Sequence, residues 1–154
     1  MNAQLQEVKG IISLLEPLDT QAGIDSESFD MSKVHRAAIA ISFGAVTGDA
    51  VLKVYVGAST GTKTTALTFR YRLSGADYKA SANDGFGAEA SSAALTLTAA
   101  TYDHRVLLID LLGVEVDPAK PWVTLELDAT ASVLLVSALA ILEPRYAPPL
   151  TAVA

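Results

Sequence analysis

One pattern dominates residues 34–142: short runs of alternating apolar and polar residues, separated by turns rich in Gly, Asp, Ser, Thr and Pro. Alternation places successive side chains on opposite faces of a strand, so each run predicts a strand with one buried face and one wet face. The clearest run covers residues 67–73, with Leu, Phe or Tyr at every odd position. We predict an all-β fold, a single jelly-roll-like β-sandwich of about eight strands.

Two further features of the pattern bear on topology. The runs at 34–43 and 51–56 are separated by a turn at 45–50, and we interpret them as a β-hairpin. In the first run His35 is expected to share a face with Ala37, Ile39 and Ile41. The last run, 133–142, is apolar on both faces, which indicates a central strand or one that lies in an interface.

The two ends of the chain differ from this β-patterned region. We divide the chain into an N-terminal arm or short helix (1–23), a β-sandwich domain (24–143) and a Pro-rich C-terminal tail (144–154). The N-terminal segment carries apolar residues at helical spacing, namely Leu5, Val8, Ile11, Ile12 and Leu15. Gly10 and Pro17 would limit such a helix to three or four turns. An extended arm that adds a strand to a sheet is the alternative, and periodicity alone does not separate the two.

Composition narrows the classes of partner. Apolar residues make up 51% of the 154 residues and charged residues 18%, an apolar excess that we expect to be buried in a homo-oligomer. The net charge of −6 argues against nucleic-acid binding, which needs a basic surface. The longest apolar run is roughly half of the ~20 residues that cross a bilayer, and the first residues do not resemble a secretory signal. We therefore expect no membrane partner.

Several residues could carry chemistry, but each pattern lacks part of what that chemistry requires. Residues 57–61 match G-x-S-x-G around Ser59, yet a β-patterned segment follows where a hydrolase needs a helix. Two loops carry oxygen ligands of the kind that bind calcium weakly, one with Asp25, Glu27 and Asp30 and one around Asp84. Neither loop has the spacing of an EF-hand. The carboxylates of Glu126 and Asp128 are expected on a wet face, and both histidines, at the starts of strands, are expected to face solvent or to contact a partner. We predict no enzyme activity, no cofactor and no resident metal.

The aromatic residues suggest one different class. Trp122 is the single tryptophan, and together with Tyr55, Tyr71 or Tyr78 it could form a sugar-stacking surface, as in a carbohydrate-binding module. A buried anchor in the core or in a subunit interface is the simpler interpretation of Trp122.

Two segments carry a resemblance to a known family. Residues 28–56 read SFDMSKVHRAAIAISFGAVTGDAVLKVYV, and residues 138–149 read ALAILEPRYAPP. Together they resemble small virion proteins of tailed bacteriophages that are encoded among the head genes and often end in a tail that reads Pro-Arg, then an aromatic residue or His, then Ala-Pro. Residues 57–63 depart from that family, because they are rich in Ser and Thr where members often carry an acidic turn.

The resemblance implies a capsid decoration (cement) protein. Such a protein would bind the major capsid protein on the outside of the virion, after synthesis in the host cytoplasm, as a trimer more readily than as a dimer. A head–tail connector or tail structural protein is the alternative within virions. We expect contacts with the capsid or with other subunits from the apolar N-terminal residues, the tryptophan and the tail: Leu5, Val8, Ile11, Ile12, Trp122, Pro144, Arg145, Tyr146, Pro148 and Pro149.

Overall fold

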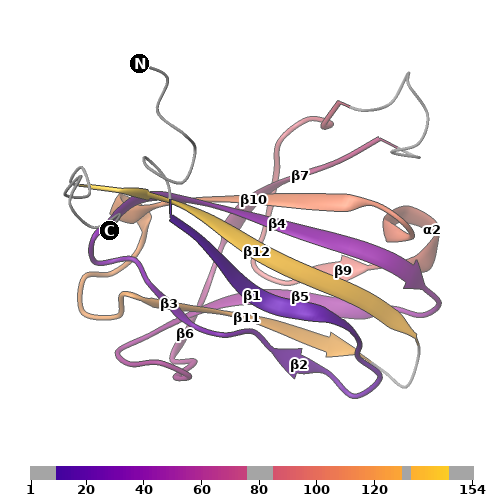
Figure 1. Cartoon of the computed structure of the whole chain (residues 1–154), viewed down its shortest axis with the longest axis horizontal. Coiled ribbons are helices and arrows are strands. Elements are labelled where there is room, and N and C mark those ends of the chain that lie inside the picture. The colour runs from indigo at the N-terminus through magenta and orange to yellow at the C-terminus, as the bar shows by residue number, and fades with distance from the viewer. Residues whose placement is uncertain (1–9, 76–84, 130–132, 146–154) are drawn as a thin grey trace, which may run out of the picture.

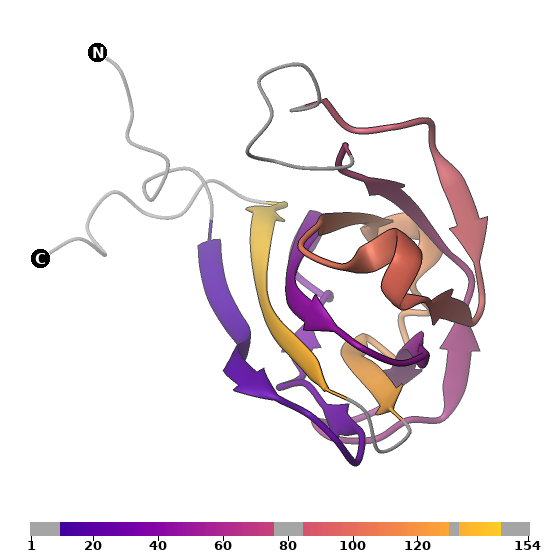
Figure 2. The ribbon, with the colours of Figure 1, turned by 90° about the vertical axis from the view of Figure 1, so that its right-hand side faces the viewer.

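A computed structural model describes residues 10–75, 85–129 and 133–145. In these ranges the chain is almost entirely β-structure, in two antiparallel sheets that pack face to face (Figures 1 and 2). The predicted all-β sandwich is therefore confirmed. Two short helical turns, α2 (Ala99–Tyr102) and η1 (Gly113–Glu115), lie beside the strands.

The first sheet, which we call sheet A, has six strands. Their spatial order is β1 (Gly10–Asp19), β12 (Leu134–Pro144), β4 (Val34–Val46), β10 (Val106–Leu112), β7 (Phe69–Leu73) and β8 (Ala90–Ser92). The last strand in sequence, β12, thus lies inside the sheet, between β1 and β4. This position agrees with a run that is apolar on both faces.

The second sheet, sheet B, is built around two long strands. Its order is β2 (Ile24–Asp25), β11 (Trp122–Ala129), β5 (Ala50–Gly57) and β6 (Thr65–Leu67), with β3 (Phe29–Asp30) also paired to β11 and β9 (Leu95–Leu97) also paired to β5. From β4 onward the chain passes repeatedly from one sheet to the other.

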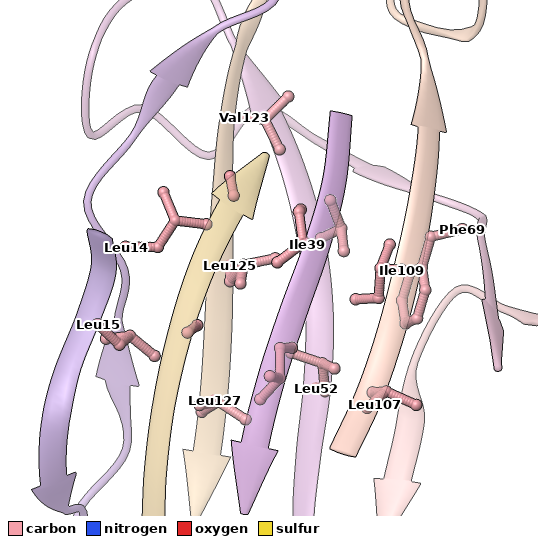
Figure 3. Close-up of a cluster of buried hydrophobic side chains, with 14 of the residues drawn as sticks. Leu14, Leu15, Ile39, Leu52, Phe69, Leu107, Ile109, Val123, Leu125 and Leu127 are labelled. Carbon is pink, nitrogen blue, oxygen red and sulfur yellow. The ribbon is translucent and has the colours of Figure 1, made fainter. Parts of the chain in front are cut away.

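The core fills the space between the sheets. Strands β4 and β10 of sheet A contribute fully buried aliphatic side chains such as Ile39 and Ile109, and strands β5 and β11 of sheet B contribute Leu52 and Leu125 (Figure 3). The alternation seen in the sequence is what places these side chains inward at every second position. The long strands of the two sheets are held together mainly by this apolar layer.

The predicted hairpin between the runs at 34–43 and 51–56 is wrong. Strand β4 belongs to sheet A and β5 to sheet B, so the short connection after Val46 crosses between the sheets. The run at 67–73 is likewise not one strand, because β6 pairs in sheet B and β7 in sheet A, with Thr68 between them. Both sheets bury their inward face in the same core, so alternation alone does not reveal which sheet a strand joins.

His35 is the other departure within the predicted strands. It is exposed, whereas Ala37, Ile39 and Ile41 are fully buried. The register of β4 against β12 shifts between the pairs Glu143–Arg36 and Pro144–Val34. This irregularity breaks the two-residue repeat and turns the His35 side chain outward.

The N-terminal segment is extended in the part that the structure describes. Residues 10–19 form β1, an edge strand of sheet A that pairs with β12, and the helical alternative does not apply to them. Leu14 and Leu15 point into the core and are 2% and 6% exposed (Figure 3). Residues 10–19 are thus built into the sandwich of their own chain.

Candidate interaction surface

The two outer faces of the sandwich differ in chemistry. The outer face of sheet B is charged: Lys63 forms ion pairs with Asp25 (2.9 Å) and with Glu126, and Lys53 approaches Glu126 at 3.7 Å. The Lys63 ammonium also lies 5.7 Å from the centre of the Tyr55 ring. Its hydrogen bonds to Glu126 and then to Asp25 raise the pKa of Lys63 above its usual range. A charged face of this kind is stable in contact with solvent.

The outer face of sheet A is apolar over its first four strands. Ile11 on β1 is 47% exposed, and Leu135 and Leu139 on β12 are 40% and 41% exposed. Ile141 and Leu108 are half-buried, and their strand positions also direct them outward. Exposure of large aliphatic side chains to water is unfavourable in free energy unless another molecule covers them. This face is therefore the strongest candidate for an interaction surface.

A trench runs along β4 in the middle of this face. From Ala38 to Gly44 the outward residues of β4 are all small, namely Ala38, Ala40, Ser42 and Gly44, and they follow the exposed Arg36. Ala40 lies between Leu139 of β12 and Leu108 of β10, whereas Ser42 lies beside Ser137 of β12. The surface is hollowed at both ends of this row. One hollow, of about 180 Å3, lies beside Ala38 and Ile141 and is also lined by the charged residues Arg36 and Glu143, and the other, of about 440 Å3, lies beside Ser42, Gly44 and Leu135.

Paired charges interrupt the apolar face beside Ala38, where Arg36 of β4 meets Asp110 of β10, and border it on the side of β7. Arg36 donates two hydrogen bonds to Asp110, at 2.7 and 2.6 Å, and its pKa is raised by this contact. Arg70 lies 3.2 Å from Glu115. These pairs are satisfied within the chain, so they mark the edge of the apolar area rather than a site that awaits a ligand.

The structure brings only some of the predicted contact residues to this face. Ile11 lies on it, but Ile12 points toward the core, and Trp122 is half-buried at the start of β11 in the opposite sheet. Pro144 and Arg145 lie at the end of sheet A, where the Arg145 N–H donates to Lys33 O and its Nε–H donates to Val34 O. The predicted contacts at Leu5, Val8, Tyr146, Pro148 and Pro149 fall outside the described residues.

Sequence reasoning did not name the most exposed side chains of the surface, Leu135 and Leu139. The available signal was the run at 133–142, whose second apolar face had no explanation in a sheet with one wet side. The small residues of β4 carry no such signal, because alanine at alternate positions is compatible with either face.

The other candidate residues lie in ordinary structural contexts. Ser59 belongs to the turn between β5 and β6, where its carbonyl accepts a hydrogen bond from the Thr62 hydroxyl, and a strand rather than a helix follows. The Asp30 carboxylate accepts hydrogen bonds from the N–H and hydroxyl of Ser32. Within the described ranges no group of three or more His, Asp or Glu side chains could hold a metal ion. No helix in those ranges is long and apolar enough to cross a membrane.

The aromatic residues do not gather on one surface. Trp122 and Tyr55 are diagonal neighbours on sheet B, but one face of the Tyr55 ring is already covered by Lys63. Tyr71 belongs to sheet A, where it packs against the core. Burial of Tyr102, and then its contact with the Tyr71 hydroxyl, raise the pKa of Tyr102 to about 12. Tyr78 and the loop around Asp84 fall outside the described residues.

Comparisons with known proteins add little to this geometry. No protein-family model matches the chain, and no curated protein matches it. Among solved structures, one chain from the structure of infectious bursal disease virus Gt strain aligns with 14% identity and a TM-score of 0.23. The alignment covers 89% of this chain and 41% of that chain. A similarity of this size carries no argument about function.

Proposed function

We propose that this chain is a structural virion protein that binds the outside of a phage capsid as a homo-oligomer and stabilises it, and that it is not an enzyme. The outer face of sheet A would be the assembly face, in contact with neighbouring copies and with the major capsid protein. The outer face of sheet B would face the solvent.

The observation that carries this proposal is the contrast between the two outer faces. In a monomer, the exposure of Ile11, Leu135 and Leu139 to water on one sheet face contributes no stability. In a lattice, the same face buries apolar area at every copy, and many symmetric copies turn weak single contacts into strong total binding. The resemblance of residues 28–56 and 138–149 to small phage head proteins points to a capsid as the lattice.

The test is co-sedimentation of the purified protein with undecorated capsid shells, with bound copies counted per particle. We expect saturable binding at hundreds of copies. Leu139→Asp should abolish binding, because it places a charge in the middle of the apolar face. The matched control is Thr96→Asp, which places the same charge at an exposed position on β9 of sheet B.

Three outcomes would contradict the proposal in different ways. If the wild-type protein is a stable oligomer that does not bind shells, the decoration role is wrong. Binding at a few copies per particle would favour a connector at a single vertex. Equal loss of binding in Leu139→Asp and Thr96→Asp would remove sheet A from its role as the assembly face. The intrinsic fluorescence of Trp122 reports whether each variant is folded.

A further inference from the structure

We infer that the outer face of sheet A binds the same face of a second copy, across a two-fold axis that runs along the strands between β12 and β4. The inference rests on the proposed function for the homo-oligomer, and it deepens that proposal by naming a second copy as the partner of this face. A closed two-fold contact makes a dimer, in place of the trimer that the family resemblance favours.

A two-fold axis in this position fixes which strands face each other. Strands β12 and β4 are neighbours in sheet A (Figure 1), so half a turn about a line between them places β12 of each copy over β4 of the other. The rotation leaves the position along the axis unchanged. Each outward side chain of β12 therefore lies over its own register partner on β4, but in the other copy.

The outward residues of these two strands are complementary at four successive levels of the sheet. Two register pairs join a large aliphatic side chain to alanine, one joins opposite charges, and one joins two hydroxyl groups. The pairs are Ile141 with Ala38, Leu139 with Ala40, Glu143 with Arg36, and Ser137 with Ser42. Across the axis, Leu139 of each copy enters the trench at Ala40 of the other. A ridge that stands directly beside a trench is thus self-complementary in shape.

The charges at the Ala38 end of the trench fit the same arrangement. The Arg36 side chain is 52% exposed even though it bonds to Asp110, and Glu143 is its register partner on β12. An apolar partner that covered these charges would remove them from water without compensation. In the two-fold arrangement, Arg36 of each copy meets Glu143 of the other. The charged end of the trench therefore favours a second copy over an apolar partner.

The same axis divides the apolar part of sheet A into equal halves. Strands β1 and β12 lie on one side of it and β4 and β10 on the other, so β1 of each copy lies over β10 of the other. Arg70 and Arg72 of β7 lie outside this overlap. Four strands are about 19 Å wide, and the row from Arg36 to Gly44 is about 27 Å long. The overlap is then roughly 1,000 Å2 of flat area for the two copies together, which reaches the size that a stable interface needs before side-chain relief is counted.

The charged pair provides the sharpest test. Across the axis, Arg36→Glu brings two acidic side chains together at each contact, and Glu143→Arg brings two basic ones together. Each variant alone should therefore raise the dissociation constant of the dimer about tenfold, as measured by sedimentation equilibrium. In an equal mixture, the heterodimer again joins opposite charges at both contacts, so its dissociation constant should return toward that of the wild type. Loss of the bonds to Asp110 is common to Arg36→Glu alone and to the mixture, so it cannot produce this recovery.

The apolar part of the contact is tested at Ala40. The wild-type protein should have twice the chain mass of 16.1 kDa by light scattering. Ala40→Phe fills the trench and should reduce the mass to that of one chain. Thr96→Phe, at an exposed position on β9 of sheet B, is the matched control and should leave the dimer intact. The emission of Trp122 reports whether each variant is folded.

The inference is overturned if the wild-type protein is a monomer or a trimer in solution, since a closed two-fold contact produces neither. It is also overturned if Ala40→Phe remains a dimer, or if the mixture of Arg36→Glu and Glu143→Arg associates no more tightly than each variant alone. All of these measurements use the protein alone in solution, so failure to bind capsid shells does not affect them. A wild-type monomer that still coats the shells would overturn the dimer and leave the decoration role standing.

Discussion

Strand β1 provides a direct test of whether the N-terminal segment is part of the fold or an arm attached to it. Leu14 and Leu15 are 2% and 6% exposed, and replacement of a buried leucine by alanine costs roughly 2 to 5 kcal/mol. At the lower end of that range, Leu14→Ala/Leu15→Ala loses about 4 kcal/mol, a large part of the 5–15 kcal/mol that stabilises a typical domain. With a urea dependence of about 2 kcal/mol per molar, the midpoint of unfolding falls by about 2 M.

The assay is urea unfolding followed by the emission of Trp122, which lies at the start of β11 in the opposite sheet and far along the chain from β1. Ile11→Ala is the matched control on the same strand, because Ile11 is 47% exposed and its replacement should cost about 1 kcal/mol. If the double variant leaves the Trp122 transition unchanged, β1 unfolds independently and our description of it as an integral strand is wrong.

Three further predictions concern other parts of the sandwich. Gly113→Ala should lower the melting temperature by several degrees, because its Cβ would lie 2.5 Å from Val34 O, and Val114→Ala is the exposed control. The pKa of Tyr102 is raised to about 12, so the folded state holds the phenol proton more tightly than the unfolded state does. The free energy that this difference contributes to folding is fully present below pH 10 and is lost as the pH rises toward 12. Tyr102→Phe should flatten the pH dependence of stability in that window, as measured by urea unfolding at each pH. Lys63→Met should cost about 0.5 to 1 kcal/mol at low salt and less at high salt, which denaturation at two ionic strengths would show.

The sequence predicted the β-sandwich because alternation directly reports burial on one face. Strand β10 shows this directly, because its buried residues are Leu107, Ile109 and Leu111, at every second position. The pairing of the strands was harder to predict from the sequence. Strands β4 and β5 have equally good alternation and a short connection, yet they lie in different sheets, because both sheets face one core and a few residues suffice to bridge them.

The interaction surface could be predicted only in part. The run at 133–142, apolar on both faces, indicated a central strand or an interface. Its two most exposed residues, Leu135 and Leu139, can be distinguished from their buried neighbours only once the register against β4 is known. The trench depends on a further relation, that Ala40 of β4 lies between the larger side chains of Leu139 on β12 and Leu108 on β10. That relation joins residues that are about 65 to 100 positions apart in the chain, and local pattern contains no information about it.

The interior position of β12 also has a consequence for biosynthesis. This strand is translated after every other strand of the sandwich, yet it separates β1 from β4 in sheet A. Until residues 134–144 emerge from the ribosome, β1 has no partner strand and β4 presents an open edge, which is a template for pairing between nascent chains. Sheet A therefore closes only after residues 134–144 have been translated, and messages truncated before residue 134 should yield chains that aggregate rather than smaller folded domains.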